Sequence, residues 1–221
     1  VNPASITKGD NISQEVTITY NPTAASSHTA TLTISSGASL SQTVTLSGSA
    51  EVANIYTKTD LAQITQYDEV IIVGTVSENA YAMSNDQETT NAPTAVPVTP
   101  VGDKLPTSAT NILWNIYKEG DNLTIYPAGN TDKWLYNTSS EAKLKVGTGD
   151  NKTYTLDATT GYLKNTAVSK YVGIYNKADW RVYALDGENI HNNIKDQTFA
   201  FYIIKGEVPE NVYTITYETN G

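Results

Sequence analysis

VTITY (16–20), TLTI (31–34) and TVTL (43–46) decide the fold class of the N-terminal part of the chain. In each stretch apolar residues alternate with Thr, so an extended strand would carry an apolar face and a hydroxyl-covered face. The separators NPT (21–23) and SSG (35–37) are turn formers. We predict three antiparallel strands that bury one face. Because three strands bury little by themselves, we expect the rest of this sandwich to precede the first residue.

The composition of the whole chain favours the same fold class. Of 221 residues, 39% are hydrophobic and only 17% are charged, against about 25% charged in an average globular domain. The chain has 15 Tyr and no Cys, and its many Thr residues suit half-buried pleated surfaces. We expect an all-β, exported protein whose stability comes from burial and strand pairing rather than from disulfides.

The charge balance excludes two classes of partner. The net charge is −9 and the pI is near 4.6, and the basic residues form no cluster, so binding to nucleic acid or to anionic lipid is disfavoured. No apolar run approaches the length of a membrane span, and no signal-peptide pattern is present. Both ends read like cuts through a longer polypeptide, so we expect any export signal or anchor to lie outside this chain.

The first 51 residues resemble a known spacer repeat. VNPASI (1–6), the run from 16 to 36 and TVTLSGSA (43–50) follow the order of the C-terminal half of immunoglobulin-like repeats of bacterial surface proteins. These repeats are called choice-of-anchor or abnormal-spindle-like modules. The resemblance implies a partial Ig-like sandwich over residues 1–51 that acts as a spacer or stalk.

The pattern changes after a linker expected over residues 51–55. TDLAQI (59–64) predicts one helical turn with Thr59 or Asp60 as N-cap. The run Val70 to Val73, closed by Gly74, is apolar on both faces and predicts a central strand. The next segment is rich in proline, which cannot donate to a strand ladder, so at most edge strands are expected there. Its prolines are Pro93, Pro97, Pro100 and Pro106.

Short strands then recur at the spacing of a sandwich or barrel. We predict them at 112–117, 122–127, 133–137, 143–147, 152–156, 161–165, 171–175, 180–184 and 198–204. An internal repeat runs through them: WLYNT (134–138) matches YLKNT (162–166), and KVG (145–147) matches YVG (171–173). A repeated hairpin of this kind predicts a β-barrel, of which a β-trefoil is one form.

Two further resemblances set the other domain boundaries. Residues 52–207 resemble an accessory module of secreted multidomain proteins of gut Bacteroidetes, through TDLAQI (59–64), YAMSN (81–85), WRVY (180–183) and FAFYIIK (199–205). The resemblance implies a location outside the cell and the kinds of neighbouring domain, and it implies no mechanism. VYTITYETNG (212–221) resembles the first strand of a Listeria–Bacteroides surface repeat, which makes 208–221 a linker and the start of a further repeat.

Residues that could carry catalysis are sparse. The chain has only His28 and His191, which we interpret as solvated loop residues, and it lacks a nucleophile elbow, a phosphate loop and a zinc motif. The acidic residues next to turn signals are interpreted as turn or cap residues, and the Gly-Asp-Asn segments as hairpin turns rather than calcium loops. We therefore predict no enzyme, no cofactor and no metal site. The acidic residues considered are Asp60, Asp68, Glu69, Asp157 and Asp179.

Aromatic residues in the repeated hairpins are the best candidates for a ligand site. Exposed Trp or Tyr rings stack on sugars, and Asn, Asp or Arg beside them contact hydroxyl groups. The alternative interpretation is that the Trp rings belong to the core, as Trp114 does. The candidate ligand-binding residues are Trp134, Tyr136, Asn137, Tyr175, Asn176, Asp179, Trp180 and Arg181.

Two functions remain open from the sequence. The first is a non-catalytic spacer and adhesion or ligand-display module at the bacterial cell surface or outside the cell, with glycans or a host or cell-surface protein as partner. The second is a carbohydrate-binding module that directs an attached hydrolase to glycans. Buried indoles at 134 and 180 would favour the first, and exposed coplanar rings the second. We expect a monomer, with no nucleic-acid partner and no membrane insertion by this segment.

Overall fold

The computed structural model describes residues 27–36, 40–49, 54–86, 92–138 and 142–205. Within these ranges the secondary structure is β, and the single helical element is a 3-10 turn, η1 Leu61–Gln63. The all-β fold class is therefore confirmed, and so is the helical turn expected over 59–64. The chain separates into two compact units, Val1–Ala53 (unit 1) and Asn54–Gly221 (unit 2), which are described separately.

Unit 1 contains one long antiparallel hairpin of strands β1 Ser27–Ser36 and β2 Leu40–Ser49. Leu32 lies opposite Val44, and Ala30 opposite Leu46, so the apolar residues share one face as the alternation predicted. Val44 is 46% exposed. The strand expected over 16–20 lies outside the described residues, and so do the segments 1–6 and 208–221.

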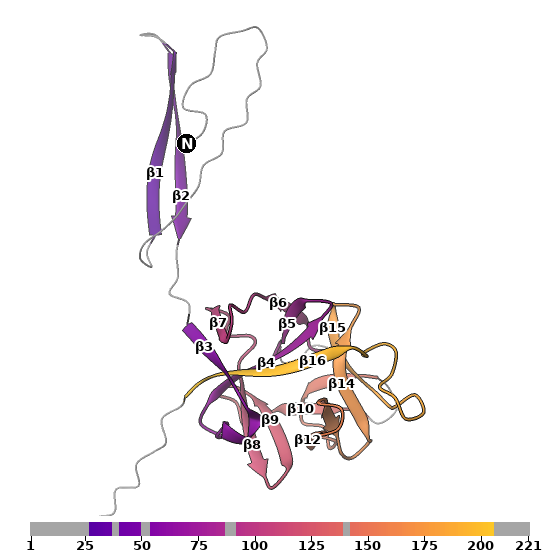
Figure 1. Cartoon of the computed structure of the whole chain (residues 1–221). Coiled ribbons are helices and arrows are strands. Elements are labelled where there is room, and N and C mark those ends of the chain that lie inside the picture. Colours follow the sequence, from indigo (N-terminus) through magenta and orange to yellow (C-terminus); the bar gives the residue numbers. More distant parts are fainter. Residues whose placement is uncertain (1–26, 37–39, 50–53, 87–91, 139–141, 206–221) are drawn as a thin grey trace, which may run out of the picture. The chain divides into compact units, whose positions relative to one another are not determined.

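Unit 2 holds the other strands, which we name by their order along the chain (Figure 1). They are β3 Asn54–Thr59, β4 Glu69–Val76, β5 Asn79–Met83, β6 Ala95–Val98, β7 Lys104–Thr107, β8 Trp114–Glu119, β9 Asn122–Pro127, β10 Trp134–Asn137, β11 Leu144–Gly147, β12 Tyr154–Leu156, β13 Leu163–Asn165, β14 Lys170–Tyr175, β15 Asp179–Tyr183 and β16 Gln197–Ile204. From β8 onward these bounds lie within about two residues of the expected ones.

Twelve of these strands form one antiparallel sheet in the order β15-β14-β13-β12-β9-β8-β4-β16-β3-β7, with β5 paired to β4 and β6 paired to β5. Strands β10 and β11 form a separate pair. The path has two ends, and no closed barrel is detected in the described part of the chain. The structure thus shows a large antiparallel sheet, whose outer strand β15 receives single bridges from Thr94 and Lys143.

Strand β4 lies between two hydrophobic clusters. Val70 and Ile72 face the main core, which also contains Trp114 and receives side chains from most strands of unit 2. Ile71 and Val73 face a second cluster on the opposite side, with Tyr56, Leu105 and Tyr202. All four β4 residues are at most 2% exposed. This confirms the prediction that a run apolar on both faces forms a central strand.

Gly74 continues β4 past the expected end of that strand and makes room for the core. A Cβ atom at Gly74 would lie 2.7 Å from Ile174 Cδ1 and 2.9 Å from Trp180 Cη2, closer than carbon atoms pack. The glycine therefore does not end the strand, which runs on to Val76. It lets the indole of Trp180 lie directly against the backbone of β4.

Two prolines mark strands with an unpaired side. Pro97 lies in β6, whose ladder is with β5, and Pro106 lies in β7, whose ladder is with β3. Both strands end a path of the sheet. This confirms that the proline-rich segment contributes edge strands only.

Strand β3 begins at Asn54, earlier than the end of the expected linker, because its first residues pair with β7. The later residues of β3 pair with β16, the last strand, with Thr57 opposite Ile203 and Thr59 opposite Phe201. Since the two strands are antiparallel, the start of β3 and the end of β16 lie at the same side of unit 2 (Figure 1). Adjacent strands are about 5 Å apart.

Candidate functional site

The candidate residues lie on β10 and on the β14–β15 hairpin, and the sequence repeat around them forms two hairpins with the same register. In β10–β11, Tyr136 lies opposite Lys145, and in β13–β14 the equivalent residue Lys164 lies opposite Tyr171. The leucines of the repeat, Leu135 and Leu163, are both fully buried. The internal repeat seen in the sequence therefore corresponds to two structurally equivalent hairpins, although only the second is part of the large sheet.

Asn137 occupies a structural position. Its side chain is 1% exposed and its Nδ2 donates to the backbone oxygen of Lys143 at 2.7 Å. Asn151 Nδ2 donates to the Asn137 oxygen at 3.0 Å, and Asn165 Nδ2 donates to the Asn151 oxygen at 2.7 Å. Through these side-chain hydrogen bonds the three asparagines connect β10, the loop before β12, and β13. No strand ladder joins β10 to β13.

The rings of Trp134 and Tyr136 are half-buried, and each ring contacts nearby groups of the protein. Trp134 Nε1 donates to the Gly149 oxygen at 2.6 Å, and the Lys152 ammonium lies 3.9 Å from the centre of the indole. Tyr136 packs directly on the backbone of Gly147 and Gly149, where no Cβ atom would fit beside the ring. Both rings therefore make contacts within the fold and remain partly exposed.

Trp180 belongs to the core. Its exposure is 0%, its Nε1 donates to the Ala82 oxygen at 3.3 Å, and its ring packs 5.9 Å from that of Phe199. The sequence contained this signal, because Trp180 and Val182 share one face of β15, opposite the face of Asp179 and Arg181. Trp180 therefore offers no ring surface to a ligand.

The outward face of the β14–β15 hairpin carries a fixed ion pair. Arg181 Nε donates to Asp179 Oδ1 at 2.7 Å, and Arg181 Nη2 donates to Asp179 Oδ2 at 2.9 Å. The guanidinium also lies 4.1 Å from the ring centre of Tyr175. The hydrogen bonds to Asp179 raise the pKa of Arg181, so its charge is permanent. Three contacts thus fix the orientation of the guanidinium.

Asn176 forms the turn of this hairpin. Asn176 and Lys177 have φ of 51° and 58°, and Ala178 N donates to the Tyr175 oxygen at 3.0 Å. Consecutive positive φ angles are tolerated best by Asn, Asp and Gly, which explains an Asn here.

Sequence reasoning missed two residues next to this face. The ring of Tyr183 stacks on the imidazole of His191 with centres 4.6 Å apart, and Tyr175 lies 6.2 Å from Tyr183. His191, interpreted as a solvated loop residue, thus packs on the hairpin. Tyr183 follows Arg181 at period two, which was a signal that it shares the outward face.

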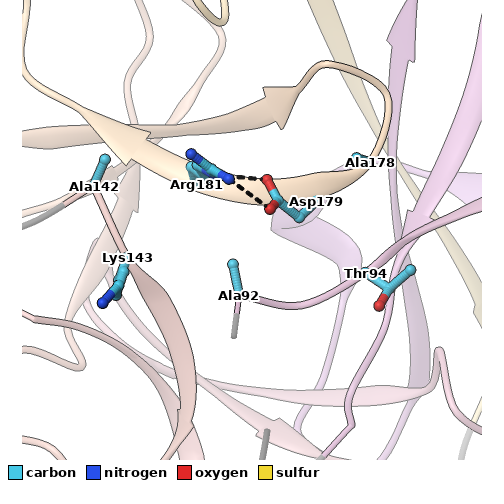
Figure 2. A pocket seen from close by; sticks show the side chains of 7 residues that line it. All are labelled: Ala92, Thr94, Ala142, Lys143, Ala178, Asp179 and Arg181. Carbon is cyan, nitrogen blue, oxygen red and sulfur yellow. Dashed lines mark hydrogen bonds and ion pairs between the residues drawn. The ribbon is translucent and has the colours of Figure 1, made fainter. Parts of the chain in front are cut away.

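A groove of about 470 Å³ lies along the outer edge of β15 (Figure 2). Figure 2 shows Ala142 and Lys143 on one side and Ala92 and Thr94 on the other, with the Arg181–Asp179 pair between them. The groove joins the two candidate hairpins, because Lys143, whose oxygen is held by Asn137, bridges Arg181. Of the predicted site residues, it brings Asp179 and Arg181 together and leaves the Trp rings outside its lining.

Asp68 and Asp157, two of the acidic residues named from the sequence, have structural contacts. Asp68, 0% exposed, accepts from Thr65 N at 2.8 Å and pairs with Lys205 Nζ at 3.0 Å. The hydrogen bond from Thr160 N lowers the pKa of Asp157, with further bonds from Thr159 and Tyr171. A lowered pKa is the opposite of what a general acid needs.

Among the described residues, no group of three His, Cys, Asp or Glu side chains could hold a metal ion. In the same ranges no helix is long and apolar enough to cross a bilayer.

Compared with known proteins, the chain matches no protein-family model and no curated sequence.

Proposed function

We propose that residues 54–205 form a non-catalytic display module of an exported surface protein and present a binding surface. The observation that carries the proposal is the pairing of the first and last strands. Thr57 of β3 lies opposite Ile203 of β16, so the chain enters and leaves unit 2 on neighbouring strands.

This arrangement favours display over spacing. A spacer gains length when its chain enters at one end and leaves at the opposite end. In unit 2 the entering and leaving strands are about 5 Å apart, so the module adds little to the length of the protein that contains it. The chain enters and leaves the module at nearly the same place. The spacer function expected for residues 1–51 is then separate from the function of unit 2.

The contacts of the candidate residues support a binding role without catalysis. Asp68 and Asp157 are engaged in structural hydrogen bonds, while Asp179 and Arg181 remain partly exposed, at 24% and 35% of their side-chain surface. The second candidate, a carbohydrate-binding module attached to a hydrolase, is supported by the groove at β15 rather than by the Trp rings.

A barrel-like organisation of unit 2 is part of the proposal. Strands from β4 to β16 direct side chains into one core cluster, and Ala95 N donates to the Ala178 oxygen at 2.9 Å across the gap between β6 and β15. The proposal includes a surface location in a protein of the Bacteroidetes type with Ig-like and Listeria–Bacteroides repeats, and it is supported by the sequence resemblances and the scarcity of charge.

Beads coated with the 221-residue chain test the proposal. They should bind immobilised mucin or plant polysaccharide better than beads coated with a Trp114→Asp variant, which places a charge in the core and unfolds unit 2. Equal binding by both would contradict display. Release of soluble sugar from either surface would contradict the non-catalytic part.

A further inference from the structure

We propose that the groove along the outer edge of β15 binds a neutral sugar ring of a glycan through its hydroxyl groups, with Arg181 and Asp179 as the main contacts. This inference rests on the proposed display function and names the ligand class and the place of binding. It does not depend on an aromatic platform.

The groove exists because two different segments share the free edge of β15. Residues 93–95 cover the first half, where Trp180 N donates to the Pro93 oxygen at 2.8 Å and Ala95 N donates to the Ala178 oxygen at 2.9 Å. Ala142 covers the second half, accepting from Val182 N at 3.3 Å. Each segment bridges β15 at one residue only. The two segments then diverge, and the groove opens between them.

The side chains in this gap suit a polyhydroxylated ligand. Arg181 donates from Nε and Nη2 to Asp179 and also makes a side-chain hydrogen bond with Tyr183. A guanidinium has five N–H groups, so the remaining ones are donors for a ligand, and the carboxylate keeps lone pairs as an acceptor. Thr94 adds a hydroxyl that both donates and accepts. Neighbouring sugar hydroxyls also donate and accept, so a fixed Arg–Asp pair matches them in both directions.

Size and charge point to a neutral ligand. Ala92, Ala142 and Ala178 line the groove with small side chains, and its volume of about 470 Å³ is that of a small-molecule site. The Arg181 charge is compensated by Asp179 at 2.7 Å. Asp179 would repel a phosphate or sulfate, and Arg181 together with Lys143, the other cation of the lining, would repel a metal ion. None of these three charges penalises an uncharged sugar.

The site is organised before a ligand arrives. Arg181 is held by Asp179 and by the ring of Tyr175, and the hairpin turn at Asn176 fixes the end of β15 next to them. A preorganised pair loses little conformational freedom on binding, which favours specificity for the spacing of two hydroxyl groups. Since the nearby rings are covered by other groups, we expect polar contacts to provide most of the affinity.

An oligosaccharide array of neutral and sialylated glycans, probed with the full chain, tests the inference. Each neutral glycan that binds is then titrated against Arg181→Lys, which keeps the charge but loses the fork, and Asp179→Asn, which loses one acceptor. Each variant should weaken binding about tenfold or more, the loss of one good polar contact. Matched controls are Lys195→Ala and Asp186→Asn, which lie in a separate groove of about 520 Å³ and should leave binding unchanged.

A measurement without variants guards against misfolding. In the wild-type chain, the methyl signals of Ala92, Ala142 and Ala178 should shift on titration with the bound glycan, while that of Ala128 should not. Glycan binding that survives both β15 variants, preference for sialylated glycans only, or shifts confined to other methyls would overturn the inference and leave display intact. A chain that binds no glycan on the array but still binds mucin-coated or protein-coated surfaces would also overturn the inference and leave the display function intact. Failure on every surface would count against the display function itself.

Discussion

Gln197 replaces a missing strand beside Ile174. The side-chain Oε1 of Gln197 accepts from Ile174 N at 2.8 Å, and its Nε2 donates to the Ile174 oxygen at 2.7 Å. Strand β13 pairs with β14 only at Lys170 and Tyr171, so it does not extend to Ile174. The carboxamide therefore satisfies both backbone groups of a buried residue that has no strand partner on that side.

Replacing Gln197 by Leu should destabilise unit 2 by about 1–3 kcal/mol, because a buried N–H and a buried C=O would lose their partners. Urea unfolding followed by tryptophan fluorescence measures this loss. Gln63→Leu is the matched control, since Gln63 is exposed and its loss should cost less than about 0.5 kcal/mol. Similar losses for both variants would contradict the role of Gln197.

Gly74→Ala should destabilise unit 2 by about 1–3 kcal/mol, the usual cost of overpacking a core. The added methyl would lie 2.7 Å from Ile174 Cδ1. Ile174→Val removes that atom, so the double variant should be less destabilised than the sum of the two single variants. Strict additivity in this double-mutant cycle would show that the two side chains do not compete for the same space.

The two tryptophans of the candidate site should differ in solvent access. Trp180 is 0% exposed, and Trp134 is half-buried under Lys152. In a Trp114→Phe background, the Trp134→Phe variant should keep a blue-shifted emission that resists iodide, and the Trp180→Phe variant should be quenched more strongly. Trp180→Ala should cost about 3–5 kcal/mol, so it is unsuitable as a binding control.

Alkaline pH should destabilise unit 2. Burial raises the pKa of Tyr56 to about 12, assisted by Glu69, and burial also raises the pKa of Tyr154, Tyr162 and Tyr202. In the unfolded chain tyrosine ionises near pH 10. A group whose folded pKa is raised stabilises below its unfolded pKa and loses that contribution as the pH rises through the folded value.

The urea midpoint should therefore show no tyrosine-dependent change below about pH 9 and should fall between pH 10 and about 12, the folded pKa of Tyr56. Tyr56→Phe should reduce the fall, whereas Tyr117→Phe, at a site with 46% exposure, should not. A midpoint that rises over this range would show that the folded state does not favour the neutral phenols.

Pulling the chain from both ends should peel β3 from β16. The ladder of Phe201, Tyr202 and Ile203 with Thr59, Lys58 and Thr57 would be loaded at one end, so its pairs break in succession. Unfolding of residues 54–205 should then release about 500 Å of chain, at roughly 3.3–3.6 Å per residue. Single-molecule force spectroscopy measures this length.

A disulfide between Thr57→Cys and Ile203→Cys should remove almost all of that extension, because the loop between the paired positions becomes closed. The chain has no native Cys to interfere. A second variant, Val76→Cys with Asn79→Cys, joins paired residues of the β4–β5 hairpin and should leave the extension nearly unchanged. Equal extension in the two oxidised variants would contradict the side-by-side arrangement of β3 and β16.

Local periodicity predicted much of the fold. The strand at β9, Asn122–Pro127, matches the expected range, and the repeated hairpins share the register that their alignment implied. The short strands β5, β6 and β7 were not assigned individually. Strands β6 and β7 each contain a proline, and β5 is a short strand without a period-two pattern of apolar and polar residues.

The candidate site was predicted less completely. Asp179 and Arg181 were identified, but the groove depends on Thr94 and Lys143, which reach β15 from other parts of the chain. No local pattern at Thr94 or Lys143 indicates that contact. The burial of Trp180, by contrast, follows from its position on one face of β15 with Val182, which period-two reasoning could have resolved.

The prolines of β6 and β7 have a consequence for a protein held at high density. Pro97 and Pro106 stand on the strands that would otherwise accept a strand from a neighbouring copy. When many copies are crowded together, the outer edges of β6 and β7 meet other copies often. Each edge lacks a backbone N–H at its proline, where a strand from another copy would need a donor. Strand pairing between copies at these two edges of unit 2 should therefore be disfavoured.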